Sequence, residues 1–162
     1  MRSVFAFIII LVFLISCNDS VYNEYKTVGD NGWDKDSIIS FSYNPNDTIS
    51  KNNVYVNLRN NENFGYSNLW LIIGIQFPDA TTIVDTLEYE MADAEGRFLG
   101  SGLTDLKENK LEYKTNVVFP NKGKYIFTVQ QAMRKAGETE GINLLEGITD
   151  VGISIEKINA ND

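Results

Sequence analysis

Histidine is absent from this sequence, and cysteine occurs only once, at position 17. Without histidine, the chain cannot use Ser-His-Asp or Cys-His catalysis, and it lacks a common zinc, copper and haem ligand. Positive charge is scarce, because 14 Lys and Arg residues face 22 Asp and Glu residues, for a formal net charge of −8. An acidic chain repels nucleic-acid phosphates. We therefore expect no nucleic-acid partner, no metal or other cofactor and no small-molecule substrate.

The first sixteen residues have the pattern of an export signal. A positively charged start with Arg2 precedes an apolar run over residues 4–15 and a small residue, Ser16, before Cys17. A transmembrane helix needs about 20 apolar residues, so this shorter run predicts a cleaved signal peptide over 1–16. The sequence LISC at 14–17 resembles the bacterial lipobox, in which the cysteine becomes the lipidated first residue. The alternative is a leftover thiol beside an ordinary cleavage site.

Lipidation of Cys17 would anchor the mature chain in a membrane. One acyl chain binds a bilayer only marginally, whereas two or more chains, such as diacylglycerol with an added palmitate, hold firmly. Asn18 follows the cysteine in place of the aspartate that typically retains lipoproteins in the inner membrane. We therefore expect an outer-membrane lipoprotein of the cell envelope that faces the periplasm.

The remainder of the chain has the pattern of an all-β protein. Residues 17–36 are polar and predict a flexible tether, and residues 37–162 predict one β-sandwich domain. Apolar and polar residues alternate along about eight segments separated by turn residues, which is typical of an antiparallel sandwich of the immunoglobulin-like or jelly-roll-like type. The expected strands include 39–43, 54–58, 69–77, 87–91, 97–103, 111–119, 125–129 and 151–155.

The same alternation predicts the core. Segment 69–77 is apolar on both faces, so we expect it in the middle of a sheet with both faces covered. Segment 135–147 is rich in Gly and Glu and predicts a long loop that could hold one helical turn. The expected core residues are Leu58, Leu71, Ile73, Ile75, Tyr89, Val117, Phe127, Val129, Ile153 and Ile155.

Acidic pairs are the only candidates for chemistry. Glu88 and Glu90 share one strand face, whereas a glycosidase needs carboxylates that oppose each other across a sugar, so the polar half of an amphipathic strand is the favoured interpretation. Asp30, Asp34 and Asp36 lack the spacing of an EF-hand loop, which favours solvated charges over calcium ligands. We expect no catalytic residue.

Three residues are candidates for contact with a partner protein. Trp70 lies in the most apolar strand, which favours a core or interface position over a sugar platform shared with Trp33. Arg59 and Arg134 each end a strand, where either could pair with a partner carboxylate or lie on the ordinary surface.

Four tripeptides combine aspartate, a hydroxyl residue and an aliphatic residue. They resemble the O-glycosylation motif of exported Bacteroidota proteins, and each could equally be a turn that opens a strand. The acceptor residues would be Ser20, Ser37, Thr48 and Thr86.

Five motifs in order resemble one lipoprotein family. They are NLRN at 57–60, YSNLWL at 66–71, GRFLGSG at 96–102, QAMR at 131–134 and GITDVG at 147–152. Together with the lipobox, they make the chain similar to the gliding motility lipoproteins of the GldH type from Bacteroidota. The resemblance implies a non-enzymatic envelope lipoprotein that serves the gliding machinery, is linked to type IX secretion and acts through protein contacts. A carbohydrate-binding lipoprotein is the alternative function.

Overall fold

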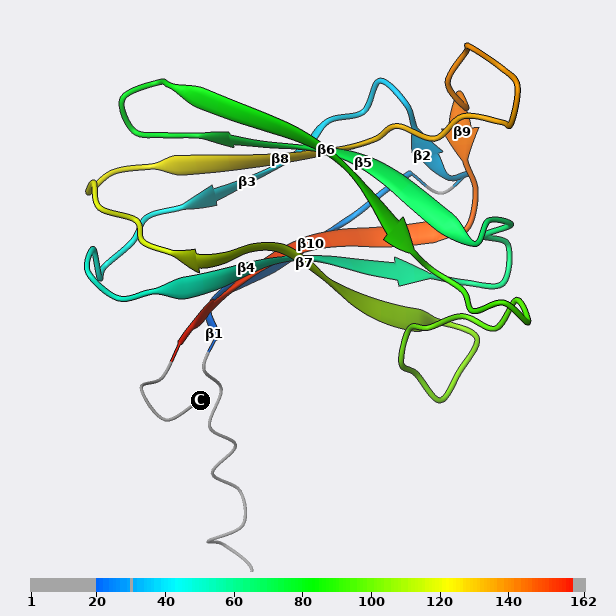
Figure 1. The fold of residues 1–162 in the computed structure, drawn as a ribbon, viewed down its shortest axis with the longest axis horizontal. Helices are drawn as coiled ribbons and strands as arrows, with labels where there is room; N and C mark the ends of the chain where they lie inside the picture. The colour runs from blue at the N-terminus through cyan, green and yellow to red at the C-terminus, as the bar shows by residue number, and fades with distance from the viewer. Residues whose placement is uncertain (1–19, 30, 159–162) are drawn as a thin grey trace, which may run out of the picture.

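All the regular secondary structure described is β-strand. The computed structural model describes residues 20–29 and 31–158, and the expected antiparallel β-sandwich is confirmed (Figure 1). The strands are β1 (Ser20–Thr27), β2 (Trp33–Asp34), β3 (Ile39–Tyr43), β4 (Asn52–Asn60), β5 (Asn68–Gln76), β6 (Thr82–Glu90), β7 (Lys107–Val117), β8 (Tyr125–Gln131), β9 (Leu144–Leu145) and β10 (Ile148–Lys157).

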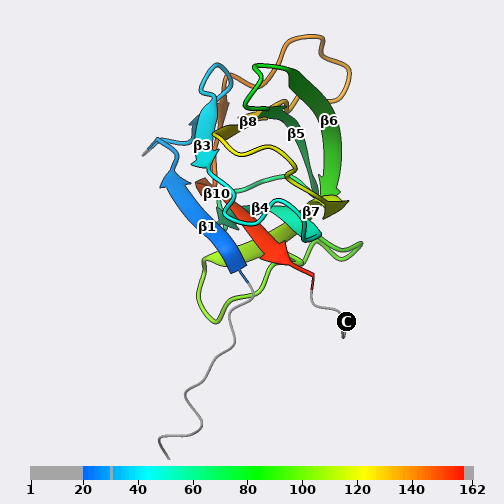
Figure 2. The same cartoon turned by 90° about the vertical axis from the view of Figure 1, so that its left-hand side faces the viewer.

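Two four-stranded sheets form the sandwich. One sheet has the order β1-β10-β4-β7 and the other β3-β8-β5-β6, while β2 and β9 pair as a small third sheet. Figure 2 shows the two large sheets packed one over the other. Counted in chain order, the eight long strands run 1-8-3-6 in one sheet and 2-7-4-5 in the other. This is the strand order of a jelly roll, one of the two sandwich types expected.

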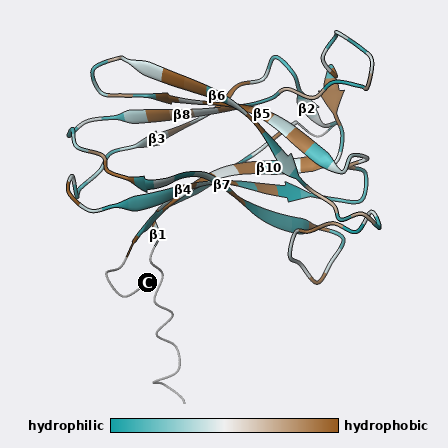
Figure 3. Cartoon of the chain, viewed as in Figure 1, coloured by the Kyte–Doolittle hydropathy of each residue, from teal (hydrophilic) through white to brown (hydrophobic). Residues whose placement is uncertain are grey.

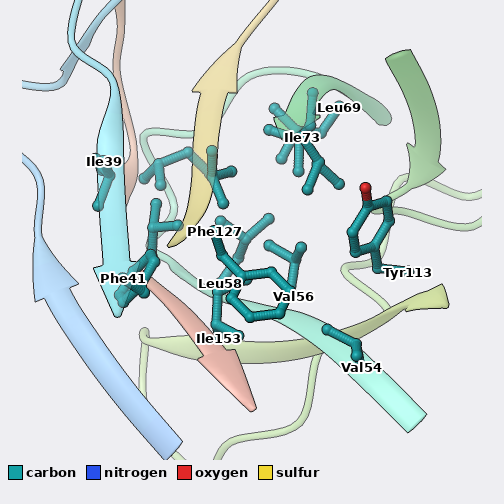
Figure 4. Packing of buried hydrophobic residues seen from close by; sticks show 14 of the residues in the cluster. Ile39, Phe41, Val54, Val56, Leu58, Leu69, Ile73, Tyr113, Phe127 and Ile153 are labelled. Atoms are coloured by element: carbon teal, nitrogen blue, oxygen red, sulfur yellow. The ribbon is translucent and has the colours of Figure 1, made fainter. Parts of the chain in front are cut away.

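The core lies between the two sheets. Figure 4 shows aliphatic and aromatic side chains from both sheets meeting there. Of the ten core residues predicted, eight are buried, whereas Tyr89 and Val117 are half-buried against the core. Phe119 closes one end of the core, with its ring 5.2 Å from Tyr43 and 5.1 Å from Tyr125, centroid to centroid. Both ring pairs have the edge-to-face geometry that aromatic pairs prefer.

The segment predicted as a tether belongs to the folded domain from Ser20 onward. Strand β1 pairs with β10 along its length, from Ser20 opposite Glu156 to Thr27 opposite Asp150. Trp33 is only 1% exposed, and its Nε1 donates a hydrogen bond to the carbonyl of Ser37 over 3.0 Å. The tether prediction was wrong here because β1 is a largely polar edge strand whose main-chain partners lie more than a hundred residues away.

Strand β5 is buried on one face only. Leu69, Leu71 and Ile73 point inward and are fully buried, whereas Trp70 keeps 38% of its surface exposed on the opposite face. The expectation that both faces of this segment are covered was therefore wrong. On this outer face Trp70 is exposed and Ile72 is half-buried, so apolar side chains there meet solvent.

Two further segments differ from expectation. Residues 97–103 form no strand and join their neighbours only through single bridges, Ala92 with Phe98 and Ser101 with Glu108. Segment 135–147 holds no helical turn; instead it includes β9, where Leu144 and Leu145 pair with β2. The small β2–β9 sheet lies at one end of the sandwich (Figure 1), with Trp33 and Leu145 both buried.

Candidate functional site

The outer face of the β1-β10-β4-β7 sheet is occupied by its own ionic and aromatic contacts. The Arg59 guanidinium lies over the Tyr25 ring, 4.2 Å from its centroid, and its Nε is 3.3 Å from Oε2 of Glu108. The Tyr25 hydroxyl donates to Oε1 of Glu108 over 2.8 Å. Burial first, and then this carboxylate, raise the pKa of Tyr25. Arg59 is thus engaged within its own sheet.

A second cluster of the same kind lies on this face. Lys110 lies 4.2 Å from the Tyr55 ring centroid and 2.7 Å from the Glu156 carboxylate. Nδ2 of Asn57 donates to Oγ of Ser154 over 2.9 Å, and both side chains are buried. Because charges and amides on this face pair across the strands, the surface offers few unpaired groups to a partner.

The outer face of the other sheet is different in character. Trp70 of β5 and Val84 of β6 are exposed, and Figure 3 shows hydrophobic residues along β5, β6 and β8, whereas in the first sheet β4 and β7 are largely hydrophilic and β10 is more apolar. A hollow of about 410 Å³ lies on this face where β5, β6 and β8 adjoin. It is lined by Trp70, Ile72, Thr86, Ala132 and Arg134. Two of the three residues predicted to contact a partner, Trp70 and Arg134, therefore lie together.

Main-chain pairing fixes the position of this hollow. Trp70 lies opposite Glu88 of β6, and its carbonyl accepts a hydrogen bond from the amide of Ala132 over 2.9 Å. On the buried side, the Trp70 amide lies 3.2 Å from the sulfur of Met133. Arg134 follows directly and pairs through its main chain with Gly141. Main-chain pairing therefore positions Trp70 within β5 and Arg134 just beyond the end of β8.

A side-chain hydrogen bond from β8 supports the loop that follows Arg134. The Gln131 side chain donates to the carbonyl of Ile142 over 2.7 Å and accepts from the amide of Met133 over 2.9 Å. Gln130 reaches across to the carbonyl of Lys35 over 2.6 Å. Gln131 thus ties segment 135–147 to the end of β8, and Gln130 ties β8 to the segment around Lys35.

The hollow presents one cation, the Arg134 guanidinium, beside a largely apolar floor. Across residues 20–29 and 31–158, no carboxylate forms an ion pair with Arg134. Guanidinium groups bind carboxylates in a bidentate geometry, and an exposed Trp can cover an apolar group. The hollow therefore suits a ligand that presents an apolar side chain close to a carboxylate.

Acidic and phenolic groups also meet where the edges of β6 and β7 face each other. Asp85 is 2.9 Å from Lys114 and accepts a hydrogen bond from the Tyr113 hydroxyl over 2.9 Å. The bond to Lys114 first, and then that to Tyr113, lower the pKa of Asp85. Burial, followed by the charge of Asp85, raises the pKa of Tyr89 to about 12, and its hydroxyl donates to the carbonyl of Glu112. These contacts join the two sheets at their open edge.

The remaining acidic candidates do not converge. Glu88 and Glu90 follow one another along the outer face of β6, in register with residues of β5. Asp34 caps its own turn by accepting the amide of Asp36 over 2.8 Å, while Asp30 lies outside the described residues. Among the described residues, no group of three acidic, histidine or cysteine side chains could hold a metal ion.

The predicted modification sites lie in different settings. Cys17 is outside the described residues. Ser20 is half-buried in β1, with its hydroxyl donating to the carbonyl of Tyr22. Thr48 is half-buried, whereas Ser37 and Thr86 are exposed. No helix in the described part of the chain is long and apolar enough to cross a membrane.

Comparison with known proteins identifies the family. The sequence profile described as "GldH lipoprotein" matches residues 20–155. The chain belongs to the GldH lipoprotein family. It is 47% identical over 156 residues to the gliding motility lipoprotein GldH homolog of Christiangramia forsetii, covering 96% of this chain and 95% of the relative. It is 48% identical over 147 residues to the gliding motility lipoprotein GldH of Flavobacterium johnsoniae, covering 90% and 91% of the two chains.

The solved structures similar to this GldH family chain are more distant. The VP2 subviral particle of infectious bursal disease virus is 18% identical, with a TM-score of 0.36, over 87% of this chain and 31% of the viral one. The chain therefore spans about a third of the length of that solved protein.

Sequence reasoning missed the lining residues Ile72 and Ala132. The available signal was parity: Trp70 and Ile72 occupy alternate positions of β5, opposite in face to Leu69, Leu71 and Ile73. Once one apolar set is assigned to the core, the other must face outward.

Proposed function

We propose that this protein is a structural or assembly component of the gliding motility machinery, linked to type IX secretion, and that it acts through protein contacts. The observation that carries the proposal is the hollow on the β3-β8-β5-β6 sheet, where Trp70 and Arg134 lie together on an apolar floor. The names of the two GldH relatives supply the process in which such contacts would serve.

The partner suited to this hollow is a protein segment with an apolar side chain next to a carboxylate. Tryptophan and arginine are enriched among the residues that dominate binding energy, and truncating such a residue costs about 2 kcal/mol or more. Main-chain hydrogen bonds fix the backbone of Trp70 within β5 and of Arg134 in a bridge to Gly141 beyond β8, which limits the ordering cost of binding. In this proposal the protein binds and has no enzymatic activity.

The alternative of carbohydrate binding has less support. A sugar platform was expected to align Trp33 and Trp70, but Trp33 is in the core at 1% exposure. Trp70 remains the one exposed tryptophan, and the guanidinium beside it favours a charged ligand over a neutral sugar.

Crosslinking followed by affinity purification from cell envelopes tests the partner surface. Trp70→Ala and Arg134→Glu should each lose the gliding and secretion components captured by the wild-type chain, and cells carrying them should glide poorly. Lys122→Glu is the matched control, since it reverses a charge in an exposed turn away from the hollow. Normal gliding and adhesin secretion in a strain that lacks the gene would overturn the proposed function.

The proposal includes a lipid anchor on Cys17 in the outer membrane, with the domain facing the periplasm. A Cys17→Ala variant should stay unprocessed and fail to incorporate labelled palmitate. Protease treatment of intact cells should leave the wild-type protein uncleaved. Normal maturation of the variant would contradict the anchor, and loss of the protein on shaving would contradict the periplasmic orientation.

Glycosylation gives a second test of the hollow. Ser37 and Thr86 are the exposed acceptor candidates, and Thr86 lines the hollow itself. A glycan on Thr86 would cover the partner surface, so we expect modification at Ser37 with Thr86 unmodified in the assembled protein. Mass spectrometry of peptides from native envelopes measures both occupancies, and full occupancy at Thr86 would contradict the proposed contact.

A further inference from the structure

The distance between the anchor and the folded domain is short. Strand β1 begins at Ser20, so only two residues separate it from Cys17 in the sequence. Three residues span at most about 11 Å when fully extended. Since β1 is paired with β10 from its first residue, the domain cannot lengthen this link without losing sheet pairs.

A bilayer surface would be within reach of the residues around the start of β1. The polar headgroup region adds about 5–8 Å to each side of the hydrocarbon core. A link of about 11 Å from a lipidated cysteine therefore ends close to the headgroups. The part of the domain that surrounds Ser20 therefore lies within reach of that bilayer.

Loop 44–51 lies directly beside the start of β1. A shallow hollow of about 150 Å³ is lined by Val21 together with Asn46, Asp47 and Lys157. Lys157 forms an ion pair with Asp47 over 2.8 Å. The amide of Ile158 donates to the carbonyl of Lys51 over 2.9 Å. The loop is thus fastened to the end of β10, which pairs with the start of β1 through Glu156 and Ser20.

This loop presents an aliphatic side chain outward. Ile49 is 84% exposed, and Val21 is 48% exposed. The amides of Ile49 and Ser50 both donate to Oδ1 of Asp47 over 3.0 Å, which fixes the loop conformation and holds Ile49 at its surface. Lys51 is exposed beside it. Aliphatic groups flanked by lysine are suited to an interface in which apolar chains meet polar headgroups.

We propose that the surface formed by Val21, Ile49, Lys51 and Lys157 docks on the lipid bilayer that holds the anchor, with Ile49 in the headgroup region. This inference rests on the lipid anchor of the proposed function. Gln76 is the last residue of β5 and lies at the end of the sandwich near the docking surface. Trp70 lies about 20 Å from Gln76 along the strand, so the Trp70 hollow is toward the opposite end of the sandwich. The docked domain would therefore hold its partner surface away from the membrane.

The test uses the full lipidated protein in phosphatidylethanolamine–phosphatidylglycerol vesicles. Because lipid occupies the only native cysteine, an introduced cysteine is the only free thiol. An environment-sensitive fluorophore is placed at Ile49→Cys or, as the matched control, at Leu144→Cys, which is 41% exposed in β9 at the far end. Brominated lipids then report contact with the bilayer.

We expect a blue shift and quenching at position 49 several-fold stronger than at position 144. Absence of quenching at 49, or equal quenching at both positions, would overturn the docking. Intact mass of the same sample reads lipidation independently. A lipidated protein without quenching refutes the docking alone, whereas a protein lacking the lipid refutes the anchor and the docking with it.

Discussion

Replacing Trp33 by alanine tests whether this residue belongs to the folded domain or to a flexible tether. Trp33 is 1% exposed, packs in the core and donates a hydrogen bond to the carbonyl of Ser37. Truncating a buried tryptophan costs about 3–5 kcal/mol, because transfer energy is lost and a cavity remains. A tryptophan in a tether would cost less than about 0.5 kcal/mol.

Trp70→Ala is the matched control for this substitution. Trp70 keeps 38% of its surface exposed on an open sheet face, so its removal leaves no enclosed cavity and should cost about 1 kcal/mol. Unfolding by denaturant and by heat, followed by circular dichroism, gives the free energy of unfolding and the thermal midpoint of both variants. Each variant is made in the chain from residue 17 with Cys17→Ser. Thermal midpoints should fall by about 10 °C for Trp33→Ala and by about 3 °C for Trp70→Ala. Equal losses, or a Trp33→Ala loss below about 1 kcal/mol, would refute the placement of Trp33 in the core of the domain.

Acid sensitivity and one glycine provide two further predictions. The pKa of Asp85 is lowered in the fold, so its stabilising contact with Lys114 is fully present above the unfolded pKa of about 3.9 and is lost as pH falls through the lower pKa of the folded state. Asp85→Asn should therefore destabilise at pH 6, and its difference from the wild type should shrink as pH falls below about 4 in denaturant titrations. A difference that grows on acidification would contradict this. Gly147→Ala should cost about 3 kcal/mol or more, because a Cβ there would overlap the Phe64 main chain at a φ of 84°. Gly137→Ala, at a φ of 81° in open space, isolates the backbone part at about 1 kcal/mol, and equal losses at both glycines would exclude the clash.

The core strands could be predicted because burial imposes a local period of two. Alternation at Leu71, Ile73 and Ile75 identified an inward face, and the same was true of Phe127 and Val129. Strand β1 could not be found in this way. It is an edge strand of mixed polarity, and its half-buried positions depend on β10, which lies over 120 residues further along the chain.

The candidate site was only partly predictable. Trp70 and Arg134 were each distinguished by chemistry, but their proximity depends on β5 pairing with β8. The sequence offered Arg59 and Arg134 as equal candidates. In the structure, Arg59 instead contacts Tyr25 and Glu108 on the other sheet. Side chains of one type thus acquire different roles from neighbours that the local sequence does not specify.

The sequence by itself determined the class of fold, because a period of two with turn residues between segments leaves strands as the only way to bury one face. It also determined that histidine-based chemistry is impossible, since the residue is absent. Only the tertiary structure decided where the domain begins, which face of β5 stays open and which arginine lies beside the exposed tryptophan. Those features arise from strand pairing between distant segments, and the hydrophobic pattern of a single strand carries no information about its partner.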